Sequence, residues 1–213
     1  MSEAKTPERA AKRARADSAS KAKQGIPEDH MLFGIPKKGR LNEKCVAMLK
    51  GIGLDHKRAN RLDYANCVGA PVTIVFLPAH DIARYIADGN VDMGITGQDI
   101  IAETECEGKV VELRQLGFGA CKLAVEAPKG EYTSAAEVAG KRIVTSFPNL
   151  TRAYFSKFEN GDKTTVTVVD GSVEVACALG LADAVVDLVE SGTTMRAAGL
   201  EAIETIMTTE VRV

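Results

Sequence analysis

The chain has 213 residues, of which 45% are hydrophobic and 26% are charged, and its formal net charge is −2 at pH 7. A chain of this length can bury a hydrophobic core, in one large domain or two small ones. No stretch approaches the ~18 consecutive apolar residues of a membrane-spanning helix, which excludes a helical membrane protein. The acidic balance argues against a general nucleic-acid-binding surface.

The cysteines and histidines show no spacing typical of disulfides or transition-metal sites. The five cysteines are odd in number and form no CxxC pair, and the three histidines lack the HExxH pattern of zinc enzymes. Free thiols in a reducing compartment are the simplest interpretation. We therefore expect no transition metal and a cytoplasmic location, with import into an organelle left open.

The N-terminal residues differ in composition from the rest of the chain. Residues 1–23 carry seven Lys or Arg and three Asp or Glu, with almost no side chain larger than alanine to bury. Such a segment cannot offset its own ordering entropy, and we predict a disordered tail over residues 1–30. The basic cluster Lys12–Arg15 also fits a nuclear signal or a nucleic-acid arm, whereas the three acidic residues count against a transit peptide.

From residue 31 onward, apolar patterns typical of strands alternate with patterns typical of helices. The predicted strands cover 31–35, 72–77, 91–95, 116–127, 142–145, 164–169, 184–189 and 200–207. The predicted helices cover 41–52, 78–88, 98–104, 135–138, 150–158, 173–180 and 195–198. This alternation predicts an α/β fold with mainly parallel sheets, right-handed crossovers, and ligands at the carboxyl ends of the strands.

The first group of candidate site residues lies between Lys37 and Arg40, where a predicted strand meets a helix. The spacing of Gly34 and Gly39 resembles a phosphate-binding P-loop, but Arg40 and the following leucine replace the Lys and Ser/Thr that a P-loop requires. Basic residues oppose the helix dipole at a helix start. An anionic partner for Lys37 and Arg40 would remove that mismatch.

Three further strand-to-helix turns bring small or polar residues to the ends of predicted strands. The first contains Asp92, Thr96 and Gly97, the second runs from Ser146 to Leu150, and the third ends at Glu174. The small residues and free amides of the first suit the ribose or phosphates of a nucleotide, the second is a candidate wall for an adenine base, and the third offers Ser172 as a possible N-cap. The alternative interpretation is that these residues only form the turns that join a strand to a helix, without binding a ligand.

The most informative stretch joins the buried strand at 184–189 to a helix through a polar loop. The loop consists of Glu190, Ser191, Gly192, Thr193 and Thr194. It supplies hydroxyls and backbone N–H groups at a helix start, where the helix dipole favours an anion. Asp187, just ahead of the loop, is placed to bind ribose hydroxyls or a metal. The loop suits a phosphorylated sugar, although capped turns of this kind also occur throughout α/β proteins without a ligand.

Several long motifs appear in the order found in one enzyme family. They are IPKKGRL, VDMGITG, GKRIVTSFPNLTRAYF, GSVEVACALGLADA and DLVESGTTMRAAGL. Together they resemble the ATP phosphoribosyltransferases, which catalyse the first step of histidine biosynthesis, from about Met31 to Met207. The residues of these motifs are more similar to those of fungal-type members than to those of most bacterial members.

The resemblance implies a two-lobed catalytic region similar to periplasmic binding proteins. The first lobe would comprise residues 31–117 plus 200–213, and the second would comprise residues 118–199. Two crossings between the lobes would form a hinge, and closure would exclude water from a reactive sugar cation.

The resemblance also implies the reaction and assigns roles to the candidate residues. The 5-phosphoribosyl group of phosphoribosyl diphosphate would pass to N1 of the ATP adenine with release of pyrophosphate. Asp187, Arg40 and Lys37 would be catalytic, and Mg²⁺ would be held by Asp187, with Glu190 as the second choice. Phosphoribosyl diphosphate would contact Arg61, Glu174 and the loop Glu190–Thr194. The nucleotide would contact Asp92, Thr96, Gly97, Ser146 and Leu150.

One departure from the family limits this transfer of roles. Many bacterial members carry an arginine shortly before an Asp-Ile helix start, but this chain has His80 beside Asp81. A catalytic role resting on that arginine therefore does not transfer. A phosphoribosyltransferase for another base and a non-catalytic two-lobed binding protein remain alternatives.

The resemblance further implies an oligomer. Family members normally continue beyond the final predicted strand, and the long forms add a histidine-binding regulatory domain. We therefore expect a homo-oligomer or a partner regulatory subunit, no nucleic acid or membrane partner, and no histidine inhibition of the chain alone.

Overall fold

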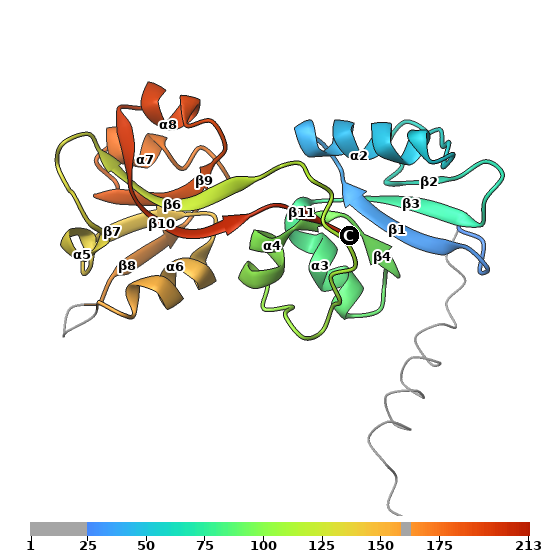
Figure 1. Cartoon of the computed structure of the whole chain (residues 1–213), viewed down its shortest axis with the longest axis horizontal. Coiled ribbons are helices and arrows are strands. Elements are labelled where there is room, and N and C mark those ends of the chain that lie inside the picture. The colour runs from blue at the N-terminus through green and yellow to red at the C-terminus, as the bar shows by residue number, and fades with distance from the viewer. Residues whose placement is uncertain (1–24, 159–162) are drawn as a thin grey trace, which may run out of the picture. The chain divides into compact units, whose positions relative to one another are not determined.

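The computed structural model, drawn in Figure 1, describes residues 25–158 and 163–213. These residues form two compact units that divide between Gly94 and Ile95. Most of the predicted N-terminal tail, up to residue 24, lies outside the described residues. Residues 25–30 form turns, and Ile26 packs against the apolar cluster around Leu32 and Ile82. In the described part of the chain, no helix has the length and apolar character needed to cross a membrane.

Unit 1 is a four-stranded sheet with two helices. Its elements are β1 (Met31–Pro36), α2 (Arg40–Gly51), β2 (Tyr64–Asn66), β3 (Val72–Leu77), α3 (Ala79–Ala87) and β4 (Met93–Gly94). The strand order is β2-β3-β1-β4, with β1 parallel to β3 and β4, and β2 antiparallel to β3. The core forms where apolar strand residues such as Ile35 and Ile74 meet Leu49 of α2 and Ile82 of α3, all fully buried.

Unit 2 is built on a five-stranded mixed sheet. Its elements are β5 (Thr96–Gly97), α4 (Gln98–Glu103), β6 (Cys121–Pro128), α5 (Ala135–Val138), β7 (Arg142–Thr145), α6 (Pro148–Phe155), β8 (Thr165–Val168), α7 (Val175–Ala178), β9 (Ala184–Val189), α8 (Thr193–Ala197), β10 (Leu200–Thr209) and β11 (Val211–Arg212). The strand order is β10-β6-β9-β7-β8. β7 runs parallel to β8 and β9, whereas β6 runs antiparallel to β9 and β10. β5 and β11 form a separate antiparallel ribbon.

The predicted α/β fold is confirmed, and the elements that differ have local causes. The strand expected from residue 116 begins only at Cys121, because Gly117 and Gly119 adopt left-handed backbone conformations with φ of 72° and 70°. The helix expected from residue 173 begins only at Val175, because i→i−3 hydrogen bonds close the preceding turn, from the N–H of Val175 to Ser172 at 3.2 Å and from the N–H of Ala176 to Val173 at 3.1 Å. The strand expected over 91–95 is reduced to Met93–Gly94.

The last long strand, β10, extends two residues beyond its predicted end and pairs with β6 along its length. Two irregularities, between Ala202 and Glu204 and between Thr205 and Met207, shift the register of this pairing. Such bulges bend a strand and increase its twist. The predicted lobe boundaries at 117/118 and 199/200 stay a prediction, and residues 95–213 all belong to unit 2.

A close approach at Gly94 generates a prediction about unit 1. A methyl group added at Gly94 would lie 2.9 Å from the carbonyl oxygen of Gly34 and 2.9 Å from a methyl of Ile82. This carbonyl belongs to β1, which is paired with β4, so it cannot move without disturbing the pairing of the two strands. We expect Gly94→Ala to lower the free energy of unfolding by about 1–3 kcal/mol, measured by urea denaturation.

Gly51→Ala is the matched control. Gly51 ends α2, has no left-handed backbone, and has nothing within 4 Å of an added methyl. Alanine favours helix over glycine by up to about 1 kcal/mol, so this variant should be as stable as the parent or slightly more stable. Equal urea midpoints for the two variants would contradict the close packing inferred at Gly94.

Candidate functional site

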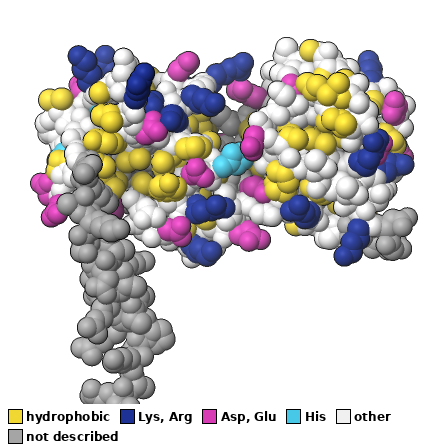
Figure 2. Space-filling view, turned by 180° about the vertical axis from the view of Figure 1, so that it is seen from behind, with side chains coloured by type: hydrophobic (Ala, Val, Ile, Leu, Met, Phe, Trp, Pro, Cys, Tyr) yellow, Lys and Arg dark blue, Asp and Glu magenta, His cyan; other side chains and the backbone are white. Residues whose placement is uncertain are grey.

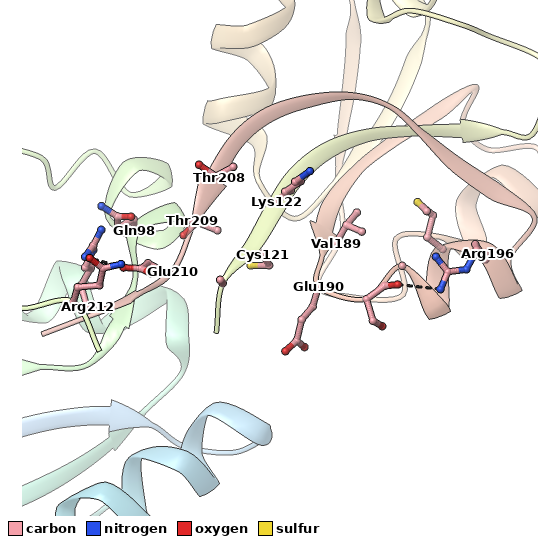
Figure 3. A pocket seen from close by; sticks show the side chains of 15 residues that line it. Gln98, Cys121, Lys122, Val189, Glu190, Arg196, Thr208, Thr209, Glu210 and Arg212 are labelled. Atoms are coloured by element: carbon pink, nitrogen blue, oxygen red, sulfur yellow. Dashed lines mark hydrogen bonds and ion pairs between the residues drawn. The ribbon is translucent and has the colours of Figure 1, made fainter. Parts of the chain in front are cut away.

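Unit 2 contains a pocket of about 610 Å³ where the ends of β6, β9 and β10 meet (Figure 3). The pairing register brings the three strands together, because Lys122 lies opposite both Val189 of β9 and Thr208 of β10. Gln98 of α4 and Arg212 of β11 also line this pocket. Residues from five separate stretches of the chain therefore contribute to one cavity.

The predicted phosphate loop forms one wall of this pocket. Glu190, Ser191 and Gly192 line it, whereas Thr193 and Thr194 are not among its lining residues. Gly192 has a left-handed backbone with a φ of 69°, which glycine adopts without strain. The hydroxyl oxygens of Ser191 and Thr193 lie 3.0 Å apart in a hydrogen bond.

The helix after this loop differs from the prediction. α8 covers Thr193–Ala197, starts two residues earlier than expected, and has only five residues. At five residues, one more than the four predicted, α8 still offers only a weak dipole. Binding of an anion would therefore depend more on hydroxyls, backbone N–H groups and charged side chains than on the helix itself.

Two cationic side chains, Lys122 and Arg196, line the pocket but were not predicted as site residues from the sequence. Arg196 donates a hydrogen bond from Nη2 to the backbone oxygen of Ser191 at 2.9 Å, as Figure 3 shows. Lys122 makes no ion pair with any residue in the described part of the chain. A signal did exist for Lys122, since Lys122 and Glu126 are the two charged residues in the otherwise apolar strand Cys121–Pro128.

The third cation of the pocket, Arg212, is already neutralised by acidic neighbours. Its Nη1 lies 2.9 Å from Oε1 of Glu210, and its Nε lies 3.3 Å from Oε2 of Glu112. Gln98 donates a hydrogen bond to the same Glu112 oxygen at 3.1 Å. This network fixes the wall formed by α4 and β11, and it leaves Lys122 and Arg196 as the cations better able to meet an anionic ligand.

Asp187 belongs to a group of carboxylates on one face of the sheet. Its partner across the β6–β9 pairing is Ala124, and Glu126 lies two residues further along β6 on the same face. Burial raises the pKa of Asp187, and Glu174 raises it further. Burial also raises the pKa of Glu126 to about 7, with added repulsion from Asp187 and Glu174. Asp187 is not among the residues that line the pocket.

A metal at Asp187 would have to draw most of its ligands from elsewhere. Among the described residues, no group of three or more His, Cys, Asp or Glu side chains is arranged to hold a metal ion. Oδ1 of Asp187 accepts the backbone N–H of Leu188 at 2.8 Å. A single carboxylate beside a substrate rich in oxygen atoms fits Mg²⁺, which usually keeps waters and phosphate oxygens as ligands.

The turns predicted to bind a nucleotide are partly engaged within the protein. The backbone N–H of Leu150 donates to Glu103, and the hydroxyl of Ser146 donates to the carbonyl of Val169 at 2.8 Å. The carboxylate of Asp92 accepts the N–H of Leu32 at 2.7 Å. Thr96 differs, because its buried hydroxyl has no hydrogen-bond partner among the described residues. These nucleotide-binding roles stay predictions.

The basic candidates of unit 1 form a group of their own. Lys37 pairs with Asp63 at 2.7 Å, and Arg58 reaches the same carboxylate at 2.8 Å. The two cations, Lys37 first, lower the pKa of Asp63. Asp63 and Arg58 were not predicted as site residues, because no sequence pattern marks the ion pair between Lys37 and Asp63, which lie 26 residues apart.

Lys37, Arg40 and Arg61 all belong to unit 1, whereas the pocket belongs to unit 2. Arg40 begins α2, directly after Gly39, whose φ is 86°. Arg61 has a left-handed backbone with a φ of 66°, uncommon for a residue other than glycine. The predicted catalytic roles of Lys37 and Arg40, and the predicted contact of Arg61 with phosphoribosyl diphosphate, stay predictions.

The sequence of this chain is similar to a known enzyme family. The family model described as ATP phosphoribosyltransferase matches residues 78–213. The ATP phosphoribosyltransferase of Debaryomyces hansenii is 50% identical over 187 residues, which cover 85% of this chain and 62% of that protein. The enzyme of Schizosaccharomyces pombe is 51% identical over 197 residues, with 85% and 64% covered. The chain therefore spans less than two thirds of the length of these relatives.

Solved structures give the same result. The ATP phosphoribosyl transferase (HisG:HisZ) complex from Thermotoga maritima matches with a TM-score of 0.73 and 28% identity, covering 85% of each chain. An ancestral arginine-binding protein matches with a TM-score of 0.53 at 16% identity, covering 87% of this chain and 84% of that one. The match to the arginine-binding protein shows the fold alone. It confirms the prediction that the fold is similar to that of periplasmic binding proteins.

The buried carboxyl of Glu126 generates a prediction about pH. Its pKa is about 7 in the folded protein and 4.5 in the reference state. The folded protein therefore holds this proton more tightly, and the associated stability is fully present below about pH 4.5 and is lost as the pH rises through 7. Glu126→Gln cannot ionise and so does not lose this stability. From pH 5.5 to pH 8, the unfolding free energy of the variant should therefore rise relative to that of the parent.

Glu137→Gln is the control for this measurement by urea denaturation at both pH values. Glu137 is exposed, and hydrogen bonds from Thr133 lower its pKa. It is ionised in the folded and unfolded states throughout this range, so its substitution should shift stability equally at both pH values. The same pH-independent shift for Glu126→Gln would show that the Glu126 carboxyl ionises normally.

Proposed function

Because the chain belongs to the ATP phosphoribosyltransferase family, we propose that it transfers the 5-phosphoribosyl group of phosphoribosyl diphosphate to N1 of the ATP adenine. Pyrophosphate is the leaving group, and the product, phosphoribosyl-ATP, enters histidine biosynthesis. The C1–O bond to pyrophosphate breaks while the bond from C1 to adenine N1 forms. The alternatives, transfer to another base or ligand binding without catalysis, receive no support from the family match.

The observation that carries this proposal is the convergence of the polar loop with two cations in one pocket. Gly192 allows the backbone to approach a ligand closely, and Ser191 supplies a hydroxyl. Lys122 and Arg196 line the same cavity. In this proposal, the loop and these two cations bind the 5-phosphate, since charge-assisted hydrogen bonds to phosphate are the strongest available there.

Asp187 has the second role in the proposal. Its carboxylate lies near the carboxyl end of β9, three residues before the loop, so it can accept hydrogen bonds from the ribose hydroxyls of the same substrate. The raised pKa of Asp187 means that a cation or hydroxyl donors would stabilise its charged form. Mg²⁺, held there with Glu190 as the second carboxylate, would neutralise the charge that develops on the departing pyrophosphate.

Orientation and charge stabilisation supply most of the rate in this scheme, and no side-chain nucleophile is required. C1 of the ribose acquires oxocarbenium character as pyrophosphate departs. Lys37 and Arg40 are assigned to the pyrophosphate, with Arg61 near them. The ion pair between Lys37 and Asp63 is solvent-exposed and therefore weak, so a pyrophosphate could replace it. Glu174, Asp92, Thr96, Gly97, Ser146 and Leu150 keep their assigned substrate contacts.

Association with other chains is also part of the proposal, as a homo-oligomer or with a regulatory subunit. Val175, Leu179 and Leu181 around α7 are 44%, 66% and 61% exposed. Figure 2 shows hydrophobic side chains gathered on the upper part of unit 2, the end where α7 lies in Figure 1. Exposed apolar patches commonly mark association surfaces. A cytoplasmic location completes the proposal, since all five cysteines are free thiols.

The test of the proposed function is release of pyrophosphate from phosphoribosyl diphosphate and Mg²⁺ in the presence of ATP. Guanine, hypoxanthine, uracil and orotate are offered in parallel reactions. We expect pyrophosphate release in the reaction with ATP and in none of the reactions with the other bases. Mass spectrometry of phosphoribosyl-ATP identifies the product. Release with another base would favour the alternative transferase, and ligand binding without turnover would favour a binding protein.

The role of Asp187 gives a sharper prediction. Asp187→Asn keeps the shape and removes the charge, so we expect kcat to fall about a hundredfold or more. Stability should not fall, because burial already disfavours the Asp187 charge. Asp88→Asn makes the same change at an exposed site and should leave kcat unchanged. Normal turnover of Asp187→Asn with an unaltered Mg²⁺ requirement would refute the assignment.

A further inference from the structure

The side chain of Glu103 is buried between two helices of unit 2 and makes an unusual set of contacts. Glu103 is the last residue of α4 and is 6% exposed. Its two carboxylate oxygens accept the backbone N–H groups of Asn149 at 2.9 Å and Leu150 at 3.0 Å. The side-chain amide of Asn149 donates in return to the backbone oxygen of Glu103 at 2.9 Å.

These contacts satisfy two helix ends at once. α6 begins at Pro148, which has no N–H, so the N–H groups of Asn149 and Leu150 are the first two that α6 leaves without an intrahelical partner. A carboxylate is the favoured partner at that positive end, and an amide donor is the favoured partner at the carbonyl end of α4. Glu103 and Asn149 therefore join α4 to α6 across 46 residues of sequence.

The other end of α4 is fixed just as firmly. Asp99 is 5% exposed, and its backbone N–H donates to the hydroxyl of Thr209 at 3.0 Å, while that hydroxyl donates to the Asp99 carboxylate at 2.7 Å. Gln98 and Thr209 both line the pocket. α4 thus begins in the pocket wall and ends against the turn that starts α6.

From this geometry we propose that Glu103 is a positioning residue for the nucleotide substrate. It holds the turn Ser146–Leu150 at a fixed place relative to the pocket wall formed by Gln98 and Thr209. The inference rests on the proposed function, because it concerns the binding of ATP by that site. It also changes one expectation, since the N–H of Leu150 is occupied by Glu103 and the turn must contact the nucleotide through other groups.

Glu103→Gln tests the proposal. The glutamine oxygen can accept from only one of the two N–H groups, and its amide hydrogens face the other. We expect the turn to loosen and the KM for ATP to rise about tenfold, as for loss of a hydrogen bond to a charged group. The KM for phosphoribosyl diphosphate should change less than about twofold. Faster hydrogen exchange at the Leu150 amide should accompany the change.

Asp183→Asn is the matched control. Asp183 also accepts a backbone N–H, from Arg142 at 2.9 Å, and pairs with the Arg142 guanidinium at 2.8 Å. Its loss lowers stability without touching α4 or the turn before α6, so the KM for ATP should not change. Asn149→Ala, which removes only the reciprocal bond, should raise the KM for ATP in the same direction by less, and it provides the test if Glu103→Gln does not fold.

The outcomes separate this inference from the proposed function. Equal rises in both KM values, or a loss of stability alone as in Asp183→Asn, would overturn the positioning role. If the parent protein releases no pyrophosphate, the proposed function fails, and calorimetric titration with ATP then decides the inference. Weaker ATP binding in Glu103→Gln than in the parent would support it, and equal affinity or no binding by either would refute it.

Discussion

The antiparallel pairing of β6 with both β9 and β10 is the constraint on which the pocket depends. Lys122 meets Val189 on one side and Thr208 on the other only because this register is kept. A slip by one residue would turn Lys122 to the opposite face and bury its charge. The bulges in β10 allow the strand to follow β6 along its length and then continue into the ribbon with β5. The fold therefore assembles the site through contacts that are distant in sequence.

The pairing of β6 with β9 also places the carboxylates of Glu126 and Asp187 on one face of the sheet, where Glu174, just before α7, repels both. Glu126, Asp187 and Glu174 interact unfavourably when charged, and burial adds to the cost for Glu126 and Asp187. A sequence selected for stability alone would place apolar residues at these positions. Such local costs are typical of functional sites, where a ligand or cation supplies the missing partner. The raised pKa values of Glu126 and Asp187 are therefore those expected where a cation or ligand is the missing partner.

The elements that carry a hydrophobic pattern of their own could be predicted from the sequence. The buried runs at β1, β3 and β9 and the amphipathic helices α2 and α3 were predicted to within two residues. β2 and β11 were missed, because strands of three and two residues are defined by their partners and not by a period. In the candidate site, the loop at Gly192 was predicted from local chemistry. Lys122, Arg196 and Glu103 were not, since their importance arises from neighbours brought close by the fold.

The loop and Arg196 depend on each other in a way that the short α8 makes important. With only five residues, α8 gives little help to an anion, so the positive charge near the loop must come from side chains. Arg196 supplies it by lying against Gly192, where an added methyl group would be 2.7 Å from Nη1. Its bond to the Ser191 carbonyl then fixes the loop backbone as well. Glycine at position 192 is therefore required twice, by the left-handed backbone and by the space that the guanidinium occupies.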